Sequence, residues 1–358
     1  MDEFARPGPT NSLTDVPGVR VGHVTLVSGQ GALVPGQGPV RTGVTAIIPG
    51  DDAYDRKFVA GVHVINGFGK MIGLPQLQEL GRLESPILLT NTLSVWDAAN
   101  GLVDYALRRH PRIGVDGPSY NPVVGECNDG WLNDIRGRHV RAAHAVQALE
   151  EAAPARVEEG AVGAGTGMVC YGFKGGIGSA SRTGRSATLE RDVTVATLVL
   201  ANFGRREDLR IDGCPVGRLL PRRQHDEARG RADRRPDRTG GDGSVIVILA
   251  TDAPLTSRQL TRLARRAAAG LARTGSVYRH GSGDFALAFS TARAYPPYVA
   301  DEGTMMNPFL SAAADVTEEA VVRALLAARP MTGRDEHHVD ALTREQIEQA
   351  RRQWQRSE

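Results

Sequence analysis

The chain has 358 residues, of which 41% are hydrophobic and 23% are charged, and its formal net charge is +2. This is the composition of a soluble globular protein, and so small a charge excludes a global field that would select nucleic acid or a membrane as partner. Three scattered cysteines exclude a disulfide framework and a paired CxxC metal site, and no apolar run approaches the ~20 residues of a membrane helix. Since the N-terminal residues show no secretory signal, we expect a cytoplasmic protein.

The predicted elements mix strands and helices along the whole chain. Apolar runs rich in β-branched residues predict strands at 19–25, 44–49, 59–65, 87–90, 122–127, 168–173, 193–202, 244–251 and 285–291. Apolar residues at helical spacing predict helices at 93–109, 138–152, 256–272 and 309–329. We therefore expect an α/β or α+β fold in which helices cover at least one sheet face.

Glycines at 163, 165 and 167 invite comparison with a nucleotide-binding loop. The spacing does not match the dinucleotide fingerprint, and a predicted strand follows where that fingerprint needs a helix. We interpret residues 168–182 instead as a β-hairpin that turns at Lys174 to Gly176. The chain also lacks GxSxG and HExxH motifs, so the sequence supports neither an α/β-hydrolase triad nor a zinc site, and we expect no metal or other cofactor.

Residues 221–243 differ from the rest of the chain. They contain seven arginines and five acidic residues among Gly and Pro, and their only apolar residues are Ala228 and Ala232. Such a segment buries too little apolar surface to offset its ordering entropy, so we expect a mobile linker.

The linker runs directly into an apolar strand at the junction of Gly243 and Ser244. The unbroken apolar run from Val245 to Ala250 is typical of a strand buried on both faces. A serine on a rigid strand can attack the carbonyl of the residue before it, and glycine tolerates the strained backbone that this attack needs. Cleavage would leave Ser244 with a free α-amine, which titrates at about 7.7–8.0 and suits a general base. The junction alone is also compatible with an ordinary strand after a linker.

Four further polar residues are candidates for the same site. Ser282 and Asp284 stand two residues apart before a predicted strand, so their side chains should share a face and could form a proton relay. Asn202 ends another predicted strand, where an amide could stabilise an oxyanion. Glu126 follows an apolar run and could pair with a substrate ammonium. Each of them alone could equally be a turn or capping residue.

Taken together, the motifs resemble the family of L-aminopeptidase/D-Ala-esterase-amidases and β-peptidyl aminopeptidases. The resemblance covers roughly residues 12 to 330. The matching motifs are DVPGVRVGH (15–23), VVGECNDG (123–130), GAGTGM (163–168), NFG (202–204), GS (243–244), ATDAP (250–254) and GSGD (281–284).

This resemblance implies a fold, a processing event and a set of roles. The fold is a four-layer αββα sandwich, like that of N-terminal-nucleophile hydrolases but with different connectivity. A single domain is cut into fragments 1–243 and 244–358, which assemble as a homo-oligomer, expected to be a tetramer of processed units. Ser244 would be the nucleophile, Asn202 an oxyanion donor, Ser282 and Asp284 the groups that orient Ser244 and move its proton, and Glu126 the anchor for the amine of a peptide, amide or ester substrate.

Two segments depart from the family pattern, and two other functions stay open. The linker cannot be matched to the family residue by residue, and residues after about 330, with His337 and His338, are expected to be a solvated tail. A self-cleaving acyltransferase resembling the ornithine acetyltransferases is one alternative, although that group is expected to use threonine as nucleophile. The other is a module that binds anions through the arginine-rich linker, against which its interleaved acids argue.

Overall fold

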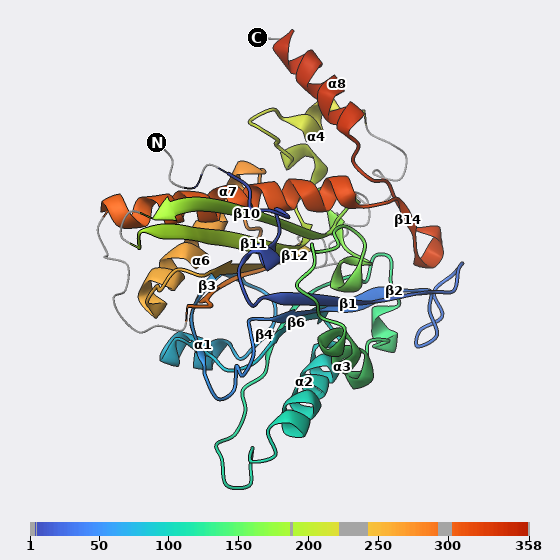
Figure 1. The fold of residues 1–358 in the computed structure, drawn as a ribbon. Helices are drawn as coiled ribbons and strands as arrows, with labels where there is room; N and C mark the ends of the chain where they lie inside the picture. Colours follow the sequence, from blue (N-terminus) through green and yellow to red (C-terminus); the bar gives the residue numbers. More distant parts are fainter. Residues whose placement is uncertain (1–3, 5, 187–188, 222–242, 293–302, 357–358) are drawn as a thin grey trace.

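The computed structural model describes residues 4, 6–186, 189–221, 243–292 and 303–356 (Figure 1). The predicted mobile linker, apart from its two ends, therefore lies outside the described residues. Ser244 and the glycine before it lie inside them.

The first of two large sheets has five strands in the order β1-β2-β6-β7-β4. Only the β6–β7 pair is parallel, and the other neighbours are antiparallel. Its strands are β1 (Arg20–Ser28), β2 (Val40–Ile48), β4 (Met71–Ile72), β6 (Ile87–Asn91) and β7 (Val123–Cys127).

The second sheet has six strands in the order β10-β11-β12-β13-β3-β5. The β12–β13 pair is parallel and all other pairs are antiparallel. Its strands are β3 (Phe58–Gly67), β5 (Arg82–Leu83), β10 (Gly176–Ser186), β11 (Arg191–Phe203), β12 (Gly243–Thr251) and β13 (Gly283–Ser290).

The two sheets pack face to face between two layers of helices, as Figure 1 shows. Helices α2 (Val95–Arg109) and α3 (Ala142–Glu150) cover the five-stranded sheet, and α6 (Ser257–Arg273) and α7 (Gly303–Ala327) cover the six-stranded one. The apolar side chains of β12 alternate between two cores: Ile246 and Ile248 point between the sheets, and Val245 and Val247 point toward α6 and α7. The expected αββα sandwich is confirmed.

Short elements complete the chain. They are η1 (Leu13–Asp15), α1 (Leu74–Leu80), η2 (Ile135–Gly137), η3 (Gly163–Gly165), β8 (Val169–Cys170), β9 (Phe173–Lys174), η4 (Arg206–Asp208), α4 (Val216–Leu219), β14 (Met331–Thr332), η5 (Arg334–Glu336), β15 (His338–Val339) and α8 (Arg344–Gln355). Among the described residues, no helix is both long and apolar enough to cross a membrane.

The hairpin predicted over 168–182 is placed differently in the structure. β8 and β9 form a hairpin of their own, which turns at Tyr171 and Gly172, and β10 pairs with β11 instead. Both turn residues have a positive φ, 52° and 73°. A two-residue turn in which both residues have a positive φ matches the right-handed twist of the two strands. Lys174 lies within strand β9, so the chain does not turn there.

The prediction of a solvated tail after residue 330 is wrong. Val339 is buried, and α8 places Ile347 and Ala350 in the same core as α6 and α7. The ring of His337 stacks on Trp131 with the ring centres 3.9 Å apart, and its Nδ1 lies 2.8 Å from the Trp131 carbonyl oxygen. The C-terminal residues are therefore packed against the body of the molecule.

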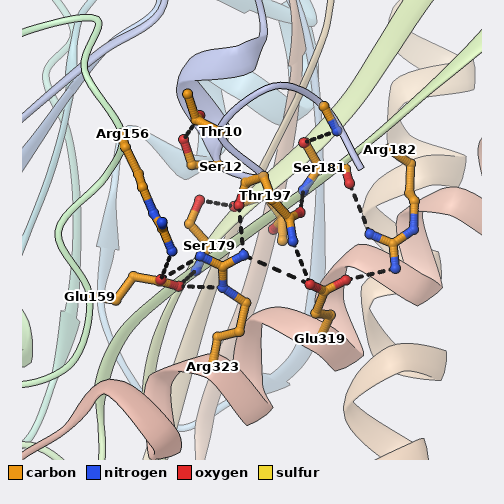
Figure 2. A network of polar contacts seen from close by, with 12 residues as sticks. Thr10, Ser12, Arg156, Glu159, Ser179, Ser181, Arg182, Thr197, Glu319 and Arg323 are labelled. Atoms are coloured by element: carbon orange, nitrogen blue, oxygen red, sulfur yellow. Dashed lines mark hydrogen bonds and ion pairs between the residues drawn. The ribbon is translucent and has the colours of Figure 1, made fainter. Parts of the chain in front are cut away.

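A partly buried polar network joins α7 to the N-terminal segment and β10 (Figure 2). Arg323 of α7 pairs with Glu159 at 2.5 Å, and Arg182 of β10 pairs with Glu319 of α7 at 2.6 Å. The hydroxyl of Ser179 accepts a hydrogen bond from the N–H of Leu13. These contacts fix α7 against strands and loops that come much earlier in the sequence.

Candidate active site

Ser244 lies near the start of β12, in the middle of the six-stranded sheet. It pairs with Asn202 of β11 on one side and with Gly283 of β13 on the other. Gly283 stands between Ser282 and Asp284, so three sequence-distant segments bring the candidate residues into one row. The side chain of Ser244 is buried.

Gly243, the residue before Ser244, has a backbone conformation and a close neighbour that only glycine accommodates without strain. Its φ is 76°, in the left-handed region, and a Cβ added there would lie 2.1 Å from the carbonyl oxygen of Asn202. No side chain fits at that distance without a shift of β11 or β12. The sheet itself therefore requires glycine at the predicted cleavage position.

The hydroxyl of Ser244 touches the peptide bond that we expect to be cut. Its Oγ donates a hydrogen bond to the carbonyl oxygen of Gly243 at 2.6 Å. The same Oγ accepts a hydrogen bond from the backbone N–H of Gly283 at 3.1 Å. The hydroxyl is thus held between the carbonyl that it would attack and a backbone donor.

Ser282 and Asp284 form a buried pair on either side of Gly283, the residue whose N–H binds this hydroxyl. Ser282 Oγ donates to Asp284 Oδ1 at 2.6 Å, as expected from residues on one face of an extended segment. Burial raises the pKa of Asp284 to about 6, and the hydrogen bond from Ser282 opposes part of that rise. The carboxyl can therefore take up or release a proton near neutral pH.

Asn202 is oriented by two backbone groups. Its Oδ1 accepts from the N–H of Val169 at 2.8 Å, and its Nδ2 donates to the carbonyl of Asn128 at 3.0 Å. The first group belongs to the β8–β9 hairpin and the second follows β7. The amide is consequently fixed in a single orientation next to Ser244.

A buried lysine that the sequence analysis did not single out supports this hairpin. The ammonium group of Lys174 donates to the carbonyls of Gly165, Met168 and Gly175 at 3.0, 2.7 and 2.8 Å. Burial lowers its pKa to about 7. Its position in a glycine-rich stretch, in a chain with only three lysines, was the available signal.

Glu126 lies on β7 with its carboxylate buried. Its Oε1 accepts from the backbone N–H of Lys70 at 3.0 Å, and its Oε2 accepts from the hydroxyl of Thr92. The ammonium group of Lys70 lies 3.7 Å from Oε1. Neither Lys70 nor Thr92 was expected, because both reach Glu126 from other segments of the fold.

Glycines connect Glu126 to the neighbourhood of Ser244. A Cβ added at Gly69 would lie 3.4 Å from Glu126 Oε1 and 2.9 Å from the Cα of Gly283. Gly283 in turn donates its N–H to Ser244. Gly69 therefore lies close to both the carboxylate of Glu126 and the glycine that binds Ser244.

Two pockets of several hundred cubic ångströms lie away from the candidate residues. One, of about 460 Å³, opens between α7 and α8, and the other, of about 310 Å³, is lined by Tyr54, Tyr105 and Tyr120. Neither contains any of the candidate residues described above. The candidate active site is therefore identified by its chemistry, at the row of Asn202, Ser244 and Gly283.

Comparisons with known proteins agree in family and in fold. The model of peptidase family S58 matches residues 11–339. The beta-peptidyl aminopeptidase BapA of Sphingosinicella microcystinivorans is 42% identical over 365 residues, which cover 98% of this chain and 90% of that protein. A solved structure of a Pyrococcus horikoshii protein is 50% identical with a TM-score of 0.87, and the match covers 98% of this chain and 96% of that one.

A further solved structure links the fold to a named enzyme. The L-aminopeptidase D-Ala-esterase/amidase of Ochrobactrum anthropi is 38% identical with a TM-score of 0.84, and the match covers 98% of this chain and 96% of that one. That protein is described as a prototype of the serine aminopeptidases and as a new variant among the Ntn hydrolase fold.

Proposed function

Because the chain belongs to peptidase family S58, and so to a family of serine aminopeptidases, we propose that it cuts itself before Ser244 and then removes N-terminal residues from peptides, amides or esters. The observation that carries this proposal is the hydrogen bond from Ser244 Oγ to the carbonyl of Gly243. It supports Ser244 as the nucleophile, because the hydroxyl lies next to the carbonyl of the bond that we propose is cut, and the backbone before it favours glycine.

In the self-cleavage step, Ser244 Oγ attacks the carbonyl carbon of Gly243. The C–N bond breaks, the acyl group moves to the serine oxygen, and water then releases the new carboxylate. The α-amine of Ser244 takes the proton and becomes a free N-terminus. With an unperturbed pKa of about 7.7–8.0, that amine can act as the general base in later turnovers.

In the peptidase reaction, a substrate with a free amine occupies the site. Glu126 holds the ammonium group, and Ser244 Oγ attacks the acyl carbonyl to form an acyl-serine. The second N–H of Asn202 and nearby backbone N–H groups, including that of Gly283, receive the oxyanion. The proton passes to the leaving amine through the Ser244 amine or the pair of Ser282 and Asp284, and water repeats the cycle.

The substrates named for the relatives support this assignment. One relative is a beta-peptidyl aminopeptidase and another is an L-aminopeptidase with D-Ala-esterase and amidase activity. We infer that a peptide, amino-acid amide or ester with a free amine is the substrate class here, and that processed units assemble as a homo-oligomer.

Intact mass spectrometry of the purified full chain tests the proposal. We expect two fragments, residues 1–243 and 244–358, and a single uncut chain for Ser244→Ala, because that variant lacks the attacking oxygen. Ser28→Ala, which changes an exposed serine at the end of β1, should be cut like the wild type. A wild-type chain that stays whole for days and leaves β-alanyl and L-alanyl anilides intact would rule out the proposed function.

A further inference from the structure

Lys70 places a positive charge directly beside the proposed ammonium anchor. Its ammonium group lies 3.7 Å from Glu126 Oε1, and its side chain is 45% exposed whereas that of Glu126 is 3% exposed. The open side of this ion pair is therefore the lysine. The following inference rests on the proposed function, because it concerns what the same site binds.

The lysine ammonium group is not required to position the carboxylate. The backbone N–H of the same residue and the hydroxyl of Thr92 already hold the two oxygens of Glu126. Lys57, by comparison, pairs with Glu84 at 2.6 Å, and Lys174 donates to three carbonyls. The looser contact of Lys70 leaves its ammonium group able to turn toward a ligand.

The adjacent charges determine which substrate fits best. A substrate that carries only an ammonium group gains from Glu126 but is repelled by Lys70, because like charges a few ångströms apart oppose each other. A substrate that carries a carboxylate next to its ammonium group satisfies both residues. Glu126 and Lys70 are thus complementary to a zwitterion, because each charged group of the substrate would lie beside a side chain of opposite charge.

We propose that Lys70 binds a carboxylate on the N-terminal residue of the substrate, so that the enzyme hydrolyses β-aspartyl peptides. In a β-aspartyl residue, two carbons separate the amine from the acyl carbonyl, as in a β-amino acid. The carbon that bears the amine also bears a free carboxylate. Glu126 would hold the ammonium group and Lys70 the carboxylate while Ser244 attacks the side-chain carbonyl.

The reaction is an ordinary hydrolysis. The serine oxygen bonds to the β-carbonyl carbon, the C–N bond to the next residue breaks, and the leaving amine takes a proton. Water then cleaves the acyl-serine. The products are aspartate and a peptide that is one residue shorter, and no further reactant is needed.

The test compares two anilides on the processed enzyme. We would measure kcat and KM for β-aspartyl-p-nitroanilide and β-alanyl-p-nitroanilide, which differ only by the carboxylate. The wild type should prefer the β-aspartyl substrate in kcat/KM by about tenfold or more. Lys70→Met should remove this preference, chiefly through KM, while Lys57→Met should retain it because Lys57 lies in another ion pair.

The other outcomes distinguish a failure of this inference from a failure of the proposed peptidase function. If the wild type hydrolyses the β-alanyl but not the β-aspartyl substrate, or if Lys70→Met changes both equally, the inference is wrong and the peptidase function stands. If neither anilide is hydrolysed, the proposed function fails. Calorimetric binding of L-aspartate and β-alanine to the same proteins then decides the subsite: tighter aspartate binding that needs Lys70 supports it, and equal binding overturns it.

Discussion

Asp284 is a buried carboxyl whose ionisation should affect both stability and the proposed reaction. Its pKa lies at about 6 instead of 3.8, mainly because burial disfavours the charged form. Between these two values the folded protein binds more protons than the unfolded chain. This contribution to the free energy of unfolding is therefore present at low pH and is lost as the pH rises through about 6.

The reaction should depend on pH in the opposite sense. If the pair of Ser282 and Asp284 carries the proton, kcat/KM should fall as the pH drops below about 6, because only the ionised carboxylate can accept the proton of Ser282. If the Ser244 amine is the base instead, kcat/KM should already fall below its own pKa of about 7.7–8.0. Asp284→Asn should lower kcat about 10²-fold or more and remove this acid limb. Steady-state rates measured across pH 4.5 to 9, a range that brackets the expected pKa, give both the loss in kcat and the loss of the acid limb.

Thermal unfolding of the same variant separates a proton-transfer role from a structural one. Since Asp284→Asn removes a charge that burial disfavours, it should not lower the melting temperature at pH 8. A variant that melts much earlier and loses activity in proportion would make Asp284 a structural residue. An acid limb that persists in the variant would assign the pH dependence to another group.

The sequence predicted the contacts of the candidate residues where those contacts depend only on local backbone geometry. Ser282 and Asp284 meet because alternate residues of an extended segment share a face, and that rule needs no partner. Lys70 and Thr92 could not be predicted, because they approach Glu126 from segments far away in the sequence. The roles of Ser244 and Asp284 remain predictions that the variants above test, and the roles of Asn202, Ser282 and Glu126 remain predictions.

Strand register places Ser244, the proposed nucleophile, within the six-stranded sheet. Asn202, Ser244 and Gly283 come from three neighbouring strands and lie in one row. The left-handed φ of Gly243 turns the chain into this row, and its missing Cβ lets β11 approach. Any side chain at Gly243 should disturb the row and move the carbonyl away from the hydroxyl.

Gly243→Ala should therefore slow self-cleavage by at least about tenfold, since a non-glycine residue at this φ is strained and its Cβ would overlap the Asn202 carbonyl. The fraction of cut chain, followed over time by mass spectrometry, gives the rate. Gly67→Ala is the matched control, because a Cβ there would lie no closer than 3.6 Å to any neighbour. Equal cleavage rates in both variants would show that backbone geometry at Gly243 does not matter.

At the level of elements, apolar patterns predicted the central strand better than the hairpins. The unbroken apolar run after Ser244 indicated a strand covered on both faces, and its side chains do alternate between two cores. The β8–β9 turn was missed because Tyr171 carries a positive φ that only the tertiary context sets. The helix α8 was missed although Thr343 and Gln346 form a capping box at its start.

The order of strands has a consequence for the whole molecule if the proposed cleavage takes place. In the six-stranded sheet, β12 and β13 belong to fragment 244–358, and they lie between β10 and β11 on one side and β3 and β5 on the other. Those four strands belong to fragment 1–243. The fragments therefore interleave, so that they can separate only if the sheet breaks.

Ion pairs between the fragments reinforce this arrangement. Arg323 on α7 belongs to the small fragment, and its partner Glu159 belongs to the large one (Figure 2). Their side chains are 16% and 9% exposed, so loss of the arginine would leave a nearly buried carboxylate with only the more distant Arg156, at 3.8 Å, as its counter-charge. Arg273, by contrast, pairs with Asp315 inside the small fragment, with exposures of 48% and 43%.

Arg323→Met should therefore destabilise the processed protein by about 2–4 kcal/mol, whereas Arg273→Met should cost less than about 1 kcal/mol. Urea unfolding, with size-exclusion chromatography to detect separated fragments, measures both.

We expect the two fragments of the wild type to elute together, at the mass of an oligomer of processed units, until the sheet unfolds. Equal midpoints for the two variants would mean that this ion pair does not hold the fragments together. Fragments that separate before the sheet unfolds would contradict the interleaved strand order itself, because β12 cannot leave β11 without breaking the row that contains Ser244.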